Sequence, residues 1–94
     1  MVKSGVLSTT LAEIYVCDNK DGVTVEKMRF TNDVAYNLNI LLFSAADNKT
    51  TTLYSLILDA GDTVTDNMGY DLQFGDKISA SSTAGKTFYS LKIV

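Results

Sequence analysis

The sequence contains no histidine, no proline and no tryptophan, and it has one cysteine. Histidine is the commonest general base and the commonest metal ligand of proteins, so its absence disfavours catalysis and metal binding. Because Cys17 is the single cysteine, no disulfide can form within the chain. We expect Cys17 to be a small apolar residue at a strand end, in a protein made in a reducing cytoplasm.

Basic clusters and long apolar segments are missing too. The 94 residues carry 8 Lys and Arg against 11 Asp and Glu, for a net charge of −3, without the basic stripe that nucleic-acid binders usually show. The longest apolar run, residues 40–43, is far shorter than the roughly 20 residues that cross a bilayer. With 46% hydrophobic residues, the composition is that of a folded, soluble domain. We therefore expect neither nucleic acid nor membrane as a partner.

What is present is a β pattern throughout the chain. Threonine, valine, isoleucine, tyrosine and phenylalanine are frequent, and apolar residues do not recur at helical spacing. Short alternating runs are separated by clusters of Gly, Asn, Asp and Ser. They cover residues 9–17, 23–31, 34–44, 50–58, 63–65, 70–74, 77–82 and 87–94. This predicts an all-β protein, an antiparallel β-sandwich (jelly-roll-like) of about seven or eight short strands.

The runs also set the expected domain organisation. Residues 9–94 are expected to form a single β-sandwich domain, and residues 1–8 a flexible N-terminal arm that docks on a neighbour. Within the run 23–31, the apolar residues Val25, Met28 and Phe30 are spaced by three and then by two. This offset indicates a β-bulge near Lys27.

Three apolar residues are candidates for an interface. In the run 34–44, Leu41 and Phe43 fall on the face opposite the core-facing set, and Phe88 does so in the last run. If they are exposed, they mark a contact surface; the alternative is a second buried layer of the sandwich. Sheets of monomers often protect their edges with proline or charge, and this chain has no proline and few charges at strand centres. We therefore expect a homo-oligomer or a member of an assembly.

Residues for chemistry are few. Asp59, Asp62 and Asp66 lie close together in the sequence, and a hard cation could bridge them. Solvated acids in turns are much the commoner explanation of such a pattern. No nucleophile–base arrangement and no phosphate-binding loop is evident, so we expect no enzyme, no catalytic residues, no cofactor and no metal.

Three segments carry a family resemblance that covers about residues 9–94. Residues 23–32 (VTVEKMRFTN), which lead into the alternating strand 36–40, resemble the "strand then Thr-Asn" element of small all-β virion proteins of tailed bacteriophages. Residues 58–64 (LDAGDTV) are similar to their "Leu-x-Ala-Gly-acid-Thr" turn, and residues 72–80 (LQFGDKISA) to their "Leu-x-x-Gly-Asp-x-Ile-x-Ala" element. The resemblance implies a structural role in decoration, neck or tail parts of a virion, with no catalytic residues.

Two functions follow as hypotheses. The first is a non-enzymatic virion structural protein, above all a capsid decoration component, made in the bacterial host cytoplasm. Its partners would be copies of itself and a phage shell or tail protein. The second is a carbohydrate-binding or adhesin β-sandwich module that uses tyrosines such as Tyr15 and Tyr89, together with Asn and Asp groups of the loops, in a shallow site. A sizing column and a glycan array would separate the two.

Overall fold

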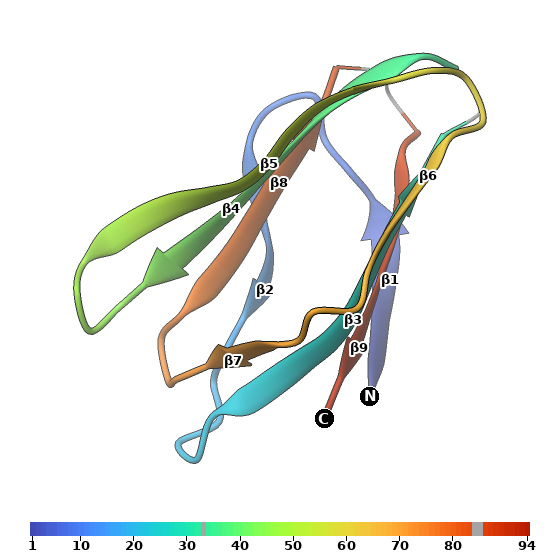
Figure 1. The fold of residues 1–94 in the computed structure, drawn as a ribbon. Helices are drawn as coiled ribbons and strands as arrows, with labels where there is room; N and C mark the ends of the chain where they lie inside the picture. Colours follow the sequence, from blue (N-terminus) through green and yellow to red (C-terminus); the bar gives the residue numbers. More distant parts are fainter. Residues whose placement is uncertain (33, 84–85) are drawn as a thin grey trace.

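The computed structural model describes residues 1–32, 34–83 and 86–94, and these ranges contain nine strands and no helix (Figure 1). Accordingly, no helix of the described ranges is long and apolar enough to cross a membrane. The strands are β1 (Val2–Val6), β2 (Ala12–Val16), β3 (Val23–Thr31), β4 (Tyr36–Ser44), β5 (Lys49–Leu58), β6 (Thr63–Asp66), β7 (Tyr70–Leu72), β8 (Lys77–Ser82) and β9 (Phe88–Ile93).

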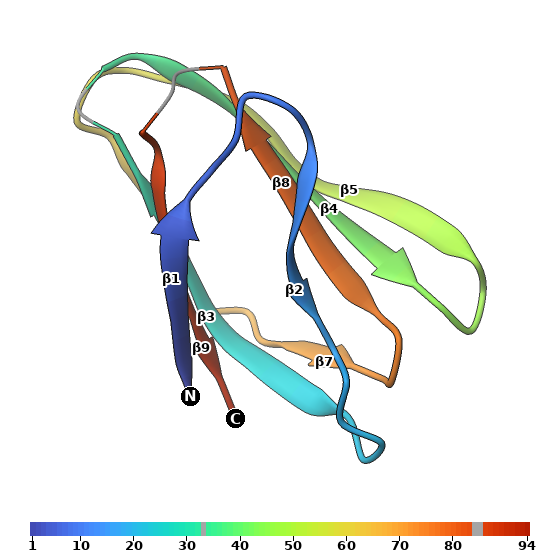
Figure 2. The same ribbon diagram turned by 180° about the vertical axis from the view of Figure 1, so that it is seen from behind.

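The strands form two sheets that pack face to face. One sheet has the order β1-β9-β3-β6, with β7 paired to β3 beside β6, and the other has the order β2-β8-β4-β5. Every ladder is antiparallel. Apart from the β4–β5 and β6–β7 connections, each connection crosses from one sheet to the other (Figures 1 and 2). This is a jelly-roll arrangement, so the predicted antiparallel β-sandwich is confirmed.

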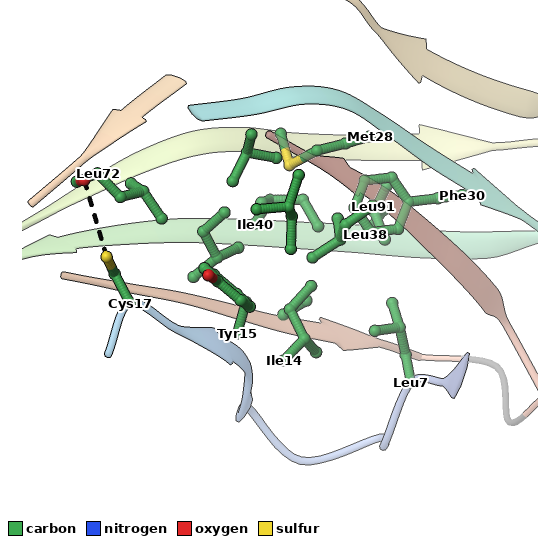
Figure 3. Packing of buried hydrophobic residues seen from close by; sticks show 14 of the residues in the cluster. Leu7, Ile14, Tyr15, Cys17, Met28, Phe30, Leu38, Ile40, Leu72 and Leu91 are labelled. Carbon is green, nitrogen blue, oxygen red and sulfur yellow. Dashed lines mark hydrogen bonds between the residues drawn. The ribbon is translucent and has the colours of Figure 1, made fainter. Parts of the chain in front are cut away.

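The core lies between the sheets and follows the alternation of the strands. In β4, Tyr36, Leu38 and Ile40 are buried, as the period of two requires. They meet Phe30 of β3 and Leu91 of β9 from the opposite sheet (Figure 3). Burying such side chains provides the main driving force for folding, at roughly 25 cal/mol per Å² of apolar surface.

The bulge expected in β3 is confirmed. In the pairing with β9, Val25 lies opposite Ile93 and Lys27 lies opposite Lys92, so Glu26 is the extra residue. The insertion shifts the alternation by one position, and Val25, Met28 and Phe30 are therefore all buried. The apolar spacing in the sequence reports this shift.

Residues 1–8 are not the flexible arm expected from the sequence, because most of them form a strand of the sandwich. Val2–Val6 forms β1 and pairs with β9 along its whole length. Met1 and Ile93 exchange two backbone hydrogen bonds of 2.8 Å, and the Leu7 N–H donates to the Thr87 carbonyl. The side chain of Leu7 is 3% exposed in the core. The segment is therefore an edge strand of the first sheet, held by backbone hydrogen bonds that its composition does not reveal.

A buried polar network joins β3, β8 and β9 at one end of the sandwich. The Asn32 amide donates to the Thr87 hydroxyl at 2.7 Å, and the Ser82 and Thr87 hydroxyls are hydrogen-bonded at 2.7 Å. The Asn32 carbonyl accepts the Gly61 N–H, which ties the turn before β6 to the same end. Buried polar groups need such partners, so the network fixes where these strands end.

Candidate assembly surfaces

Leu41 and Phe43 lie on the outer face of β4, half-buried among side chains of neighbouring strands. The Lys77 ammonium lies 5.7 Å from the centre of the Phe43 ring, within the range of a cation–π contact. The same ammonium is 3.0 Å from a carboxylate oxygen of Glu13 in β2. Part of the apolar surface predicted here is thus already covered by the stem of Lys77.

Phe88 lies on the outer face of the other sheet and is 58% exposed. Its neighbours across the ladders are Val6 of β1 and Thr31 of β3. Leu41 and Phe43 are therefore on the opposite outer face of the sandwich, and the structure does not bring the three candidates into one patch. Their role in an interface remains a prediction.

The lateral sides of the sandwich are a different kind of surface. β1 and β2 are the edge strands on one side, and β5, β6 and β7 are the edge strands on the other (Figures 1 and 2). β5 is the longest strand, with 10 residues, and among the described strands it pairs with β4 alone. Its single charged residue is Lys49. A bulge at Leu53 interrupts the edge, yet an edge of this length with so little charge is unusual in a protein that stays monomeric.

A groove opens between β1 and β2, where no described strand closes the gap between the sheets. Its volume is about 500 Å³. Lys3 on β1 reaches across it, and its ammonium lies 5.8 Å from the centre of the Tyr15 ring. Apolar atoms of Ile14 and Val16 contribute to the wall, and Met1, Glu13 and Asp18 complete it. The groove exposes part of the core edge on this side.

The other side is closed by a cluster around Asp66, which we call the aspartate–tyrosine cluster (Tyr54, Asp66 and Tyr70). Asp66 is 4% exposed, and one of its carboxylate oxygens accepts 2.5 Å hydrogen bonds from the hydroxyls of Tyr54 and Tyr70. The second oxygen accepts the Met68 N–H at 2.8 Å. Because Tyr54 belongs to β5 and Asp66 to β6, the cluster joins the two sheets.

The cluster shifts the pKa values of its members. Burial is the largest influence on Asp66 and favours its neutral form, but the two tyrosine hydroxyls and the Met68 N–H together outweigh it and lower the pKa of the carboxyl. Burial, followed by the hydrogen bond to Asp66, raises the pKa of Tyr70. Asp66 is thus a carboxylate stabilised by tyrosine donors, and this arrangement stabilises the fold. None of the three side chains keeps the ordinary pKa of its type.

The three aspartates considered for a cation point to different places. Asp66 turns inward to its tyrosines, whereas the Asp62 carboxylate accepts the Asp59 N–H at 3.0 Å in the turn before β6. No three His, Cys, Asp or Glu side chains within residues 1–32, 34–83 and 86–94 are grouped as metal ligands would be. The turn interpretation accounts for Asp62, whereas the tyrosines around Asp66 come from separate strands and were not expected from the sequence.

The residues considered for sugar binding and for a reactive thiol lie wholly or partly inside the molecule. Tyr15 is buried against the core, so its ring face is not free to stack on a sugar, and Tyr89 is half-buried. Cys17 is 1% exposed, and its thiol lies 3.8 Å from the Leu72 carbonyl (Figure 3). The sequence-based interpretation of Cys17 as a buried apolar residue at a strand end agrees with this position.

No protein-family model matches the chain, and no curated protein matches it. Among solved structures, the chain is similar to a protein of the disulfide-linked pili that Bacillus endospore appendages form. The two share 14% identity with a TM-score of 0.61, over 99% of this chain and 80% of that chain. PirA aligns over 99% of this chain and 93% of its own, at 8% identity and a TM-score of 0.49, which is too low to carry an argument. At these identities the comparison with the pilus protein establishes a shared fold.

Proposed function

We propose that this chain is a non-enzymatic structural subunit that polymerises with copies of itself into an extracellular, appendage-like filament. The observation that carries the proposal is the pair of open lateral sides, above all the 10-residue edge strand β5 with its single charge. An unpaired edge presents a row of backbone donors and acceptors that another strand can extend. The fold shared with a pilus protein supports the same conclusion.

The polymer would differ from the similar pili in its linkage. Those pili are disulfide-linked, whereas the single cysteine of this chain is buried in the core. A disulfide through Cys17 would require the strand end to leave the core. We therefore propose a polymer held by strand pairing and side-chain packing, which reducing agents leave intact.

The finer hypothesis of a phage virion protein stays a prediction, because the comparisons do not show a relationship to virion proteins. A virion component and an appendage subunit share the property proposed here, which is self-association into a regular array. The carbohydrate-binding alternative loses one of its two tyrosines, because Tyr15 is buried.

The test is self-association of the purified chain. Light scattering after size exclusion and negative-stain microscopy should show filaments whose length grows with protein concentration and persists in dithiothreitol. A chain that remains monomeric at the highest soluble concentration, in low and in high salt, would contradict the proposal. A monomer that binds a defined sugar on a glycan array would favour the alternative.

A further inference from the structure

The strand directions make the two lateral sides complementary. Each sheet has four strand positions from one lateral side to the other, and neighbouring strands are antiparallel. β1 therefore runs opposite to β6, and β2 runs opposite to β5. A second copy shifted along the sheets without rotation would bring its β1 antiparallel to β6 and its β2 antiparallel to β5. Both sheets can continue across one junction.

The shapes of the two sides are also complementary. The β1/β2 side has the groove of about 500 Å³ beside Ile14 and Tyr15. The opposite side is filled by the aspartate–tyrosine cluster, and Met68 protrudes from it with 80% of its surface exposed. Its N–H is bonded to Asp66, and Gly69 follows with a φ of 77°, which turns the chain sharply there. A flexible, polarizable methionine is well suited to fill an irregular apolar groove.

Charge is distributed unevenly between the two sides. Residues 50–76 contain five aspartates and no lysine or arginine. Asp62 and Asp71 are exposed, next to β6 and on β7, and their carboxylates accept hydrogen bonds from the Asp59 N–H and the Thr24 hydroxyl. On the opposite side, Lys3 and Asp18 are exposed at the groove, and Glu13 is paired with Lys77. Attraction between Lys3 and the exposed aspartates favours encounter of the two different sides over encounter of two β5/β6/β7 sides.

We infer that subunits join head to tail: the β1/β2 side of one copy docks on the β5/β6/β7 side of the next, Met68 enters the groove, and both sheets continue through the junction. This inference rests on the proposed function and specifies its interface. A contact between different surfaces leaves one free surface at each end of the growing chain, and a junction without the rotation that closes a ring produces an open filament.

A two-fold contact is the competing arrangement, and it fits less well. Joining two β5/β6/β7 sides would bring together two surfaces rich in aspartate, and like charges repel. Joining two β1/β2 sides would leave both grooves without a protruding residue to fill them. Such contacts also close on themselves and give dimers.

Cross-linking of single-cysteine positions separates these arrangements. Ala12→Cys lies at the start of β2 and Thr52→Cys lies in β5, and both positions are exposed. The native Cys17 is buried, so the wild-type chain with a flexible bis-maleimide serves as the control for background reaction. We expect linked dimers when the two variants are mixed and assembled, and little product from either variant alone. Strong product from Thr52→Cys alone or from Ala12→Cys alone would indicate a two-fold contact and overturn the inference.

A matched pair of substitutions tests the contact residue. Met68→Ser should raise the concentration needed for assembly by about tenfold or more, because a tenfold change corresponds to roughly 1.4 kcal/mol, less than the value of burying one apolar side chain. Val34→Ser, the control, removes an apolar side chain that is also largely exposed, in the connection between β3 and β4, and should leave assembly unchanged. Both variants should melt like the wild type in the monomeric state.

The outcomes distinguish the inference from the function on which it rests. Filaments that form normally with Met68→Ser but fail with Phe88→Ser would place the contact on the sheet face and overturn the head-to-tail arrangement, with the structural function intact. A wild-type chain that never assembles would overturn the proposed function and the arrangement together.

Discussion

Replacing Asp66 with asparagine tests how the sandwich is held closed on its β5/β6/β7 side. Asp66 accepts three hydrogen bonds, from the hydroxyls of Tyr54 and Tyr70 at one oxygen and from the Met68 N–H at the other. Asparagine has one acceptor oxygen, so its amide group must face either the tyrosines or the Met68 N–H. At least one buried donor then loses its acceptor, and the remaining bonds lose the assistance of a charge.

The expected cost follows from these losses. A hydrogen bond to a charged group contributes about 1.5–3 kcal/mol, and a buried donor left without a partner costs about 1–3 kcal/mol. We therefore expect Asp66→Asn to lower the free energy of unfolding by about 2–4 kcal/mol. For a domain of this size, each kcal/mol corresponds to roughly 4–8 °C in Tm. The melting temperature should thus fall by about 10–25 °C in circular dichroism.

The pH dependence gives a second readout of the same carboxylate. Because the pKa of Asp66 is lower in the folded state, its contribution is fully present above the ordinary aspartate pKa of about 3.9 and is lost as the pH falls through the lowered value. In Asp66→Asn this acid-induced loss should be smaller. Asp47→Asn, an exposed substitution in the β4–β5 turn, is the control and should change stability by less than about 0.5 kcal/mol. A variant at Asp66 as stable as this control, with the wild-type pH profile, would refute the reasoning.

Three further predictions concern stability. Deleting residues 1–8 should lower Tm strongly because it removes β1 and Leu7, and an unchanged Tm would support the flexible arm instead. Leu7→Ala alone should lower the free energy of unfolding, measured by urea titration, by about 2–5 kcal/mol. Burial raises the pKa values of Tyr36 and Tyr70 in the folded state. Their contribution to stability should therefore be fully present below the ordinary tyrosine pKa of about 10 and should decline as the pH rises above it. Tyrosinate absorbance should appear together with unfolding and not before it. The Cys17 thiol should react with an aromatic disulfide reagent only after denaturant unfolds the chain; rapid labelling of the native protein would contradict its burial.

Local patterns in the sequence were sufficient for the strands that carry the core. The alternation of residues 36–40 and the shifted spacing of Val25, Met28 and Phe30 each specify which side of a strand faces inward. This works because side chains of a strand alternate between faces, and a bulge changes that alternation by one residue. The fold class and the bulge in β3 could therefore be predicted.

β1 could not be predicted in this way, for a physical reason. Residues 2–6 (VKSGV) have no clear alternation, and their exposed side chains contribute little to the core. What holds them is backbone pairing with β9, at the far end of the sequence, as in the bond from the Met1 nitrogen to the Ile93 carbonyl across 92 positions. Backbone groups are the same in every residue, so their pairing leaves almost no trace in composition.

The amino-acid pattern alone thus specified an antiparallel sandwich, its core-facing residues and weakly protected edges. The tertiary structure added which edges share a side, and it assembled the aspartate–tyrosine cluster from β5, β6 and β7. It also placed the groove beside Tyr15 on the β1/β2 side, opposite the side formed by β5, β6 and β7. Burial is encoded residue by residue in the alternation of each strand. The two lateral surfaces depend instead on which strands cross between the sheets, and the short polar connections allow these crossings but do not determine them.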